Sequence, residues 1–467
     1  CKRVLDKLSS GWMESMVEQS LPKYTHVEEA RADLHERNVR AVELQFTDVM
    51  GIVKSVTIDL DVLPAAVEAG VWFDGSAVES FARVAESDMY LMPDLSTLAI
   101  LPWEAHREDV GRTARVFCDV YTPNAQPFAG DPRGALRRAV EAAAEQGVRY
   151  RVAPELEYYI FRDSPEEGPL VADDQSSYFD ASDGTARVIR KRVGDALRAM
   201  GIVVESSHHE VGGGQHELDL APLDVLQAAD AIVTARTAVR TIAAQEGRFA
   251  TFMPKPISDA PGSGMHVHQW LASCETDENI FTDPADEYGL SAAGRHFLAG
   301  QLAHAREMCA VLAPLVNSYR RLMSGLEAPI YVTWAQLNRG ALVRVPRLAE
   351  GQQFGTRIEM RAPDPSCNPY LAFAVMLQAG LRGMRDELAL PPAADEELYE
   401  VSNRRRHLTT LPTSLDIALE EFESSELARE ALGLHLYERF LEAKRLEWQD
   451  YLLVVSPWEL ERYLGIY

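Results

Sequence analysis

Basic residues are scarce in this chain of 467 residues. Its 46 lysines and arginines stand against 71 aspartates and glutamates, which gives a formal charge of −25 at pH 7. Nucleic acids and anionic membranes attract proteins with positive surfaces. The charge balance therefore argues against both as partners, although a local basic pocket is compatible with an acidic total.

Cysteines and long apolar runs are also lacking. The five cysteines are scattered and form neither a paired metal motif nor a redox motif, which fits a reducing compartment. No apolar run reaches the roughly 18 residues that a membrane span needs. The first residues carry no apolar core of the kind found in signal peptides. We therefore expect a cytoplasmic protein.

Hydrophobic patterning predicts a small sheet domain followed by a larger α+β domain. Residues 40–60 alternate apolar and polar side chains on both sides of a turn at 48–51, which indicates a β-hairpin. Asp131 as N-cap and Pro132 at the first helical position begin a helix that Gly147 ends. The boundary is therefore expected near residue 125.

The expected division has three parts: an N-terminal extension (1–25), a small sheet domain (26–125) and a larger domain (126–467). The larger domain alternates short strand-like runs with helical patterns. These patterns cover about 184–200, 223–246, 291–312, 366–388 and 414–450.

Two glutamates stand two residues apart in the strand-like run "VAPELEYYIF". Side chains alternate across a strand, so Glu155 and Glu157 lie on the same face. A solvated face of a surface strand would explain one such pair. The same spacing of polar groups recurs in two further strand-like runs, at His266 and His268 and at Glu359 and Arg361.

A glycine turn separates two more glutamates in "SSHHEVGGGQHELDL", where Glu210 and Glu217 can meet across a hairpin. So many carboxylates on one sheet repel one another unless cations neutralise them. Oxygen ligands with a single imidazole suit Mg²⁺ or Mn²⁺, whereas zinc favours more cysteine or histidine. The sequence therefore predicts a site for two ions. The candidate ligands are Glu155, Glu157, Glu210, Glu217, His266 and Glu359.

Arginines accompany this acidic set in the second half of the chain. Guanidinium groups suit carboxylate and phosphate oxygens. Metal ions together with arginines indicate phosphoryl transfer. The candidate arginines are Arg321, Arg339, Arg344, Arg357 and Arg361.

Several motifs, in order along the chain, resemble the glutamine synthetase family in its bacterial and archaeal class I form. They include "WFDGSAVESF", "PELEYYIF", "HHEVGGGQHE", "GSGMHVH", "NSYRRL" and "RIEMRAPDPSCNPY", and the resemblance begins at about residue 28. It implies an N-terminal β-grasp-like domain and a larger catalytic domain with an antiparallel sheet and helices. It also implies a dodecamer of two hexameric rings, with active sites between subunits.

The resemblance further implies ligation of ammonia to the γ-carboxylate of glutamate, with ATP as co-substrate. Phosphorylation of the carboxylate replaces a poor leaving group, oxide, by phosphate. The implied ligands of the first metal ion are Glu157, Glu210 and Glu217. Those of the second are Glu155, His266 and Glu359.

The remaining implied roles concern substrates and proton transfer. Asp74, on a loop that serves a neighbouring subunit, helps to deprotonate ammonium, and Glu327, on a flap over glutamate, takes a proton as the amide forms. Without the resemblance, Asp74 would be interpreted as an Asx-turn residue and Glu327 as a solvated loop residue. Glutamate and ammonium would contact Arg321, Arg361, Tyr178 and the backbone of Gly262. The ATP phosphates would face Arg339, Arg344 and His268, with Arg357 and Glu205 near the nucleotide.

Two positions depart from the family pattern near the second substrate. Ala77 stands where the family usually has a serine hydroxyl in the ammonium pocket, and Pro261 stands where ammonia-using members commonly have asparagine. A glutamate–amine ligase of the γ-glutamylpolyamine type is therefore an alternative to glutamine synthesis. A third hypothesis is an inactive structural relative, which the complete set of candidate metal ligands disfavours.

Overall fold

The computed structural model describes residues 24, 26–78, 88–104, 110–166, 170–181, 184–323, 328–348, 355–395 and 408–467. The chain divides into two compact units. Unit 1 comprises Cys1–Gly134 and Ala153–Phe252, and unit 2 comprises Ala135–Val152 and Met253–Tyr467. The expected N-terminal extension, apart from Tyr24, lies outside the described residues.

Unit 1 begins with a mixed sheet whose strand order is β2-β1-β6-β4-β3, with β5 on β6. Its strands are β1 (Val39–Thr47), β2 (Val53–Asp59), β3 (Val71–Asp74), β4 (Asp88–Pro93), β5 (Ala99–Ile100) and β6 (Arg112–Tyr121). Two helices, α2 (Val27–Glu36) and α3 (Leu63–Ala69), belong to this part, as do the 3₁₀ turns η1 (Leu60–Val62), η2 (Gly75–Ala77), η4 (Leu95–Thr97) and η5 (Pro102–Glu104). Strand β1 pairs antiparallel with β2 and parallel with β6.

The predicted β1–β2 hairpin is confirmed. Its turn is closed by Asp48, whose Oδ1 accepts a hydrogen bond from the backbone of Ile52 at 2.9 Å. Gly51 lies in the turn at a φ of 78°, a conformation that glycine adopts without a Cβ penalty.

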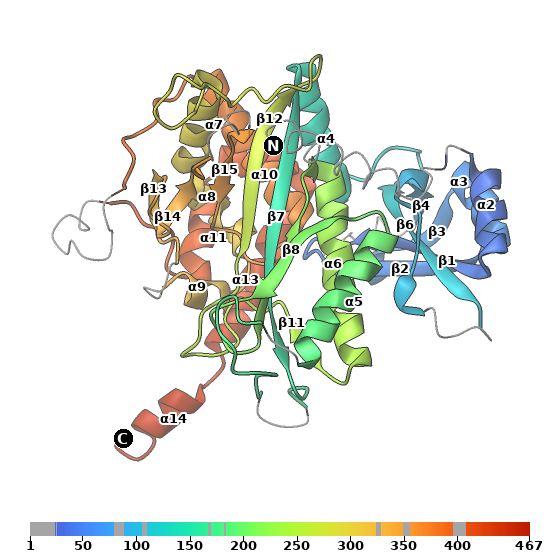
Figure 1. The fold of residues 1–467 in the computed structure, drawn as a ribbon, viewed down its shortest axis with the longest axis horizontal. Coiled ribbons are helices and arrows are strands. Elements are labelled where there is room, and N and C mark those ends of the chain that lie inside the picture. The colour runs from blue at the N-terminus through green and yellow to red at the C-terminus, as the bar shows by residue number, and fades with distance from the viewer. Residues whose placement is uncertain are drawn as a thin grey trace, which may run out of the picture. The chain divides into compact units, whose positions relative to one another are not determined.

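The rest of unit 1 carries the predicted acidic strands. Here β9 (Gln215–Leu220) pairs antiparallel with both β7 (Val148–Phe161) and β8 (Val204–His209), and β11 (Phe249–Thr251) pairs with β7. The short β10 (Leu223–Asp224) leads into α6 (Val225–Gln245). Figure 1 shows α6 side by side with α5 (Thr185–Ala199). Helix α6 buries side chains on most of its circumference, which is typical of a core helix.

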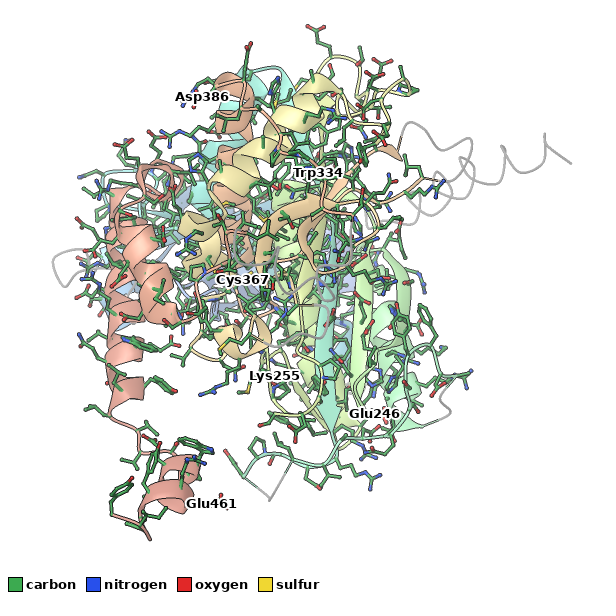
Figure 2. The ribbon with its side chains drawn as sticks, turned by 90° about the vertical axis from the view of Figure 1, so that its left-hand side faces the viewer. Glu246, Lys255, Trp334, Cys367, Asp386 and Glu461 are labelled. Atoms are coloured by element: carbon green, nitrogen blue, oxygen red, sulfur yellow. The ribbon has the colours of Figure 1, made fainter. Side chains whose placement is uncertain are left out.

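Unit 2 holds a second set of strands in the order β13-β14-β15-β12. These are β12 (Met265–Ser273), β13 (Tyr331–Ala335), β14 (Ala341–Arg344) and β15 (Ile358–Met360). Pairing is antiparallel between β12 and β15 and between β14 and β15. Trp334 and Cys367, labelled in Figure 2, are among the buried residues of this unit.

Unit 2 also holds helices, most of which contribute buried side chains to its core. They are α4 (Pro132–Glu145, which starts in unit 1), α7 (Ala292–Ala303), α8 (Ala305–Leu312), α9 (Ser318–Arg321), α10 (Pro369–Arg385), α11 (Leu415–Glu423), α12 (Glu426–Leu432), α13 (Leu434–Leu452) and α14 (Pro457–Tyr463). Helices α7 and α10 touch through glycines: a Cβ at Gly300 or Gly383 would collide with the backbone of the other helix. The absence of side chains at these positions therefore sets the distance between the two helices.

Most predicted helices are confirmed, but two were predicted too long. The start of α4 agrees, because Asp131 Oδ1 accepts a hydrogen bond from the backbone of Arg133 at 3.0 Å. The pattern at 291–312 forms two helices, α7 and α8. The pattern at 414–450 forms three, because Ser425 caps a new helix and Gly433 follows it at a φ of 77°. The α+β class and the two-part architecture are confirmed, whereas the boundary near residue 125 stays a prediction.

Candidate active site

Strand register gathers the predicted metal ligands of unit 1. In the β7–β9 pair, Glu157 lies opposite Glu217, and Glu155 lies opposite Asp219. The ligand oxygens of Glu155 and Glu217 lie within 4.8 Å of each other. Glu157 is 8% exposed and Glu217 7%. The carboxylates are thus held close together in a largely dehydrated environment, where their mutual repulsion is strong.

A histidine that the sequence analysis did not single out lies between two of these glutamates. His208 Nε2 is 3.1 Å from Glu210 Oε1 and 3.1 Å from Glu217 Oε2. The two carboxylates raise the pKa of His208 to about 10. In the sequence, His208 stands two residues before Glu210 on the same strand-like run, so the two side chains are expected on the same face.

The same cluster is short of positive charge. Burial raises the pKa of Glu217 well above its ordinary value, and the charges of Glu157 and Glu155 raise it further. The ligand atoms of His208, Glu210 and Glu217 lie within 4.8 Å of one another. Carboxylate oxygens at this spacing are the donors that Mg²⁺ and Mn²⁺ prefer, so the residues present fit a divalent cation.

The glycine turn between β8 and β9 is shaped by its neighbours. Gly214 adopts a φ of 70°, and a Cβ on Gly212 would collide with the hydroxyl of Tyr159. Gln215 bridges the turn to the acidic cluster: its Oε1 accepts from the backbone of Gly212 at 3.1 Å, and its Nε2 donates to Glu157 Oε2 at 3.1 Å. The turn therefore also orients one of the predicted metal ligands.

Unit 2 surrounds its predicted ligand Glu359 with cations. Register places Glu359 opposite His268 of β12 and Arg344 of β14. Arg344 lies 2.9 Å from one carboxylate oxygen, and Arg361 donates to the other at 2.6 Å. His266 Nδ1 lies 4.0 Å from the carboxylate. Burial opposes the ionisation of Glu359, but His268 and Arg361 outweigh it and lower the pKa below its ordinary value.

The predicted glutamate-binding residues of unit 2 are close together. Arg321 is buried and donates hydrogen bonds to the carbonyl oxygens of Ala362 and Arg361, both at 2.9 Å. A Cβ on Gly262 would lie 2.8 Å from Arg321 Cγ, so the Gly262 backbone lies against the arginine stem. Arg357 Nε donates to His268 Nδ1 at 3.3 Å, which brings two predicted nucleotide-side residues together.

The remaining predicted residues lie at exposed positions, in a turn or outside the described chain. Asp74 is exposed and accepts from the backbone and hydroxyl of Ser76 at 3.0 and 2.6 Å, which is the geometry of an Asx-turn. Tyr178 is 39% exposed, with its ring 5.6 Å from that of His208. Glu205 is exposed on β8, and Arg339 lies in the turn before β14. Glu327 and the side chain of Ala77 lie outside the described residues.

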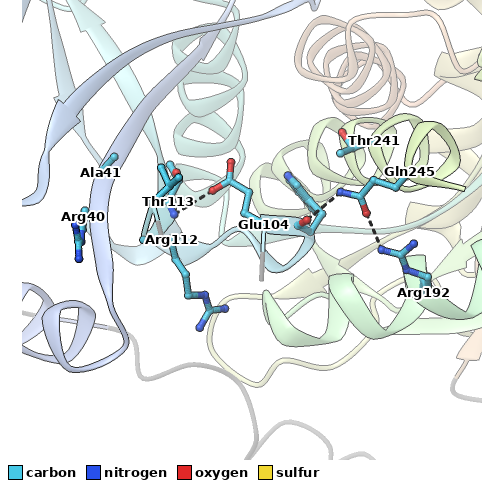
Figure 3. Close-up of a pocket in the computed structure, with 11 residues that line it drawn as sticks. Arg40, Ala41, Glu104, Arg112, Thr113, Arg192, Thr241 and Gln245 are labelled. Carbon is cyan, nitrogen blue, oxygen red and sulfur yellow. Dashed lines mark hydrogen bonds between the residues drawn. The ribbon is translucent and has the colours of Figure 1, made fainter. Parts of the chain in front are cut away.

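A separate cavity of about 730 Å³ lies in unit 1 beside Arg40, Arg112 and Arg192 (Figure 3). The carboxylate of Glu104 turns to the backbone of Thr113, from which it accepts a hydrogen bond at 3.1 Å. None of the predicted site residues lines this cavity. The cavity is therefore not the candidate active site, despite its size.

Acidic strand faces suited to divalent cations, together with buried arginines, are typical of enzymes that transfer phosphoryl groups. Comparison with known families narrows this class. The family model described as "Glutamine synthetase, beta-Grasp domain" matches residues 38–123, and "Glutamine synthetase, catalytic domain" matches residues 129–463. The chain belongs to the glutamine synthetase family.

Individual relatives agree with the family match. The glutamine synthetase of Thermotoga maritima is 44% identical over 444 residues, which cover 94% of this chain and 99% of the relative. That of Thermus thermophilus is 45% identical, with 95% and 100% covered. Two solved structures, titled "Apo GmaS without ligand" and "GmaS/ADP complex", superpose with TM-scores of 0.83 and 0.84. Each is 28% identical and covers 93% of this chain and 99% of its own.

Proposed function

We propose that this chain joins ammonia to the γ-carboxylate of glutamate with ATP as co-substrate, giving glutamine. Family membership and relatives named glutamine synthetase at 44 and 45% identity over nearly the whole chain support this activity. The observation on the chain itself that carries the proposal is the buried carboxylate cluster of the β7–β9 pair, with His208 between Glu210 and Glu217.

The proposed metal ligands follow from the two acidic groups. Glu157, Glu210 and Glu217 would hold one Mg²⁺ or Mn²⁺, and Glu155, His266 and Glu359 a second. When bound, divalent cations offset the negative charge of phosphate oxygens and of the carboxylates themselves. The raised pKa of Glu217 supports this, because a buried carboxylate short of cations is the group that a metal ion would stabilise in its ionised form.

The first chemical step needs glutamate and ATP held in line. Arg321, Arg361 and the backbone of Gly262 would bind glutamate, and one γ-carboxylate oxygen attacks the γ-phosphorus while ADP leaves with the bridging oxygen. Arg339, Arg344 and His268 would face the phosphates, with Arg357 and Glu205 near the nucleotide. Guanidinium groups in a buried site stabilise the charge that spreads over the transferred phosphoryl oxygens.

The second step releases phosphate from γ-glutamyl phosphate. Asp74 would take a proton from ammonium, the resulting ammonia attacks the acyl carbon, and Glu327 would take the proton that leaves the new amide nitrogen. Tyr178 would lie at the ammonium end. The exposure of Asp74 supports a role toward a neighbouring subunit, because its carboxylate is accessible among the residues that the structure describes.

Assembly into a dodecamer of two hexameric rings is part of the proposal. The C-terminal segment supports an oligomer, because α14 extends beyond the end of α13 (Figure 1), and Glu461 marks it in Figure 2. Apolar side chains on this segment are exposed, among them Leu453 at 82% and Leu464 at 75%. Contiguous exposed apolar surface marks an interaction site, and a second copy of this chain is the proposed partner.

A cytoplasmic location is proposed from the scattered cysteines and from the use of ATP and glutamate. The four cysteines in the described part of the chain are free thiols, as expected in a reducing compartment. Within the same residues, none of the helices combines the length and apolarity that crossing a bilayer would require.

The test is phosphate release from ATP with glutamate and Mg²⁺, comparing ammonia with ethylamine, putrescine and spermine at equal concentration. We expect turnover with ammonia and glutamine as the product. Turnover with a larger amine only would contradict the proposal and make Ala77 and Pro261 the specificity positions. The curated relatives with 42 to 45% identity are named glutamine synthetases, which supports ammonia over a larger amine as the second substrate.

A further inference from the structure

Asp174 lies on the loop before α5 and contacts the β8–β9 hairpin. Its Oδ1 accepts a hydrogen bond from the backbone of Gly214, in the glycine turn, at 3.4 Å. The same oxygen lies 2.7 Å from Nε2 of His209, the last residue of β8. One carboxylate oxygen therefore holds the hairpin at two points, one on the strand and one on the turn.

His209 connects this carboxylate to a proposed metal ligand. The ring is buried, and its second nitrogen, Nδ1, lies 2.6 Å from the carbonyl oxygen of Glu210. The two nitrogens of this one ring therefore link the Asp174 carboxylate to the backbone of Glu210. The position of the Glu210 backbone thus depends on Asp174 through one side chain.

The loop that carries Asp174 is itself anchored. The backbone of Ser176 donates to Asp174 Oδ1 at 3.0 Å, which fixes the carboxylate to its own loop. The backbone of Phe179 donates to the carbonyl oxygen of His209 at 3.1 Å. A Cβ on Gly213 would lie 3.0 Å from the carbonyl oxygen of Asp174, so loop and turn are in close contact. Asp174 is therefore held firmly enough to position the hairpin.

A metal ion bound directly at this cluster is disfavoured by the hydrogen bond of a second histidine. Arg190 donates to Nδ1 of His216 at 3.0 Å, so the proton of the neutral His216 ring is on Nε2. A protonated nitrogen has no lone pair for a metal. Asp174, His209 and His216, whose ligand atoms lie within 4.8 Å of one another, therefore serve as an anchor rather than as a separate metal site.

We propose that Asp174 is a positioning residue for the metal site: through His209 and the glycine turn, it fixes the Glu210 carboxylate at the spacing that a divalent cation requires. The inference rests on the proposed function, which places Glu210 among the metal ligands. Partners that orient metal ligands typically change metal affinity by roughly 10- to 100-fold when they are removed.

The experiment measures Mn²⁺ affinity directly, by following the paramagnetic resonance of free Mn²⁺ as it is titrated with the full-length protein. Asp174→Ala should raise the Kd about 10- to 100-fold, and Asp174→Asn, which keeps an acceptor but loses the charge, should raise it less. Asp173→Asn is the matched control. It removes a charge from the neighbouring position, where the carboxylate binds Arg248 instead of the hairpin, and should keep the wild-type Kd.

An unchanged Kd in Asp174→Ala would overturn the inference, and so would an equal loss of affinity in Asp173→Asn, because the effect would then belong to the loop in general. Wild-type protein that binds no Mn²⁺ would overturn the proposed metal site as well. If Asp174→Ala does not fold, His209→Gln replaces it and should also weaken Mn²⁺ binding. Amide exchange at Gly212–Gly214 in metal-free protein provides a second readout: it should accelerate in both Asp174 variants and stay unchanged in the control.

Discussion

Arg133 forms a bidentate ion pair with Asp230. Its Nε and one terminal nitrogen donate hydrogen bonds to the two carboxylate oxygens at 3.1 and 3.0 Å. Arg133, near the start of α4, also donates to Asp119 of β6 at 2.7 Å and to Asp94 at 2.8 Å. The arginine is buried, with only 3% of its surface exposed. Within unit 1, this single cation joins the N-terminal sheet to α6.

Replacing this arginine should destabilise the protein strongly. Arg133→Met would leave three aspartates without their shared cation, and breaking a buried ion pair in this way costs about 3–5 kcal/mol. Urea denaturation followed by circular dichroism measures the change. Lys191→Met is the control: its ion pair with Asp195 on α5 is exposed, and we expect a change below about 0.5 kcal/mol. An equal loss of stability in both variants would show that the buried ion pairs of Arg133 do not stabilise the fold more than an exposed ion pair does.

Asp131 should make stability fall as the pH rises in the mildly acidic range. Burial, followed by the charge of Asp119, raises the pKa of Asp131 to about 6. The folded state therefore binds a proton that the unfolded state has already lost, so this residue stabilises the fold at low pH and loses that effect between about pH 4 and 6. A shift of about two units corresponds to roughly 3 kcal/mol.

The pH effect is measured as the difference between wild type and Asp131→Asn in urea denaturation from pH 4 to 7. The variant should be relatively more stable at pH 7 than at pH 4, because asparagine cannot ionise. Asp163→Asn, at an exposed position, should follow the wild-type profile. A pH-independent difference between wild type and Asp131→Asn would contradict the prediction.

Glu359→Ala should abolish phosphoryl transfer while the oligomer persists. The substitution removes a proposed metal ligand and leaves the positive charges of Arg344 and Arg361 facing each other without their shared carboxylate. We expect phosphate release to fall by at least about 10²–10³-fold. Glu278→Gln, on an exposed turn, is the control for activity. Analytical ultracentrifugation follows assembly, and loss of the oligomer in Glu359→Ala would mean that the residue is structural.

Local periodicity was sufficient to predict the acidic strands and their hairpin. The alternation around Glu155 and Glu157, and the glycine turn before Glu217, depend on residues that are neighbours in sequence. The same holds for the N-terminus of α4, where Asp131 and Pro132 act within one turn. These features therefore needed no knowledge of distant contacts.

What the sequence could not predict depends on long-range pairing. Nothing in the local pattern places Arg344, His268 and Glu359 side by side, because their strands come from three separate segments. His208 was missed because its contact with Glu217 depends on how β8 pairs with β9, which the spacing of His208 and Glu210 alone does not show. The sequence has no glycine or proline at His304, where α7 ends and α8 begins, so the local pattern did not predict this break. In each case tertiary packing, rather than local propensity, decides the outcome.

The contact between α7 and α10 offers a test in which chemically identical substitutions should have opposite effects. In Gly383→Ala, the new Cβ meets the backbone of α7, and overpacking of this kind costs about 1–3 kcal/mol or more. In Gly194→Ala, within α5, the new Cβ meets open space, and the gain in helix propensity should stabilise by about 0.5–1 kcal/mol. Thermal and urea denaturation of the two variants measure the change in the free energy of unfolding that each substitution causes. If Gly383→Ala were neutral, the two helices would be able to separate without cost, and the close approach would not be what holds this part of unit 2 together.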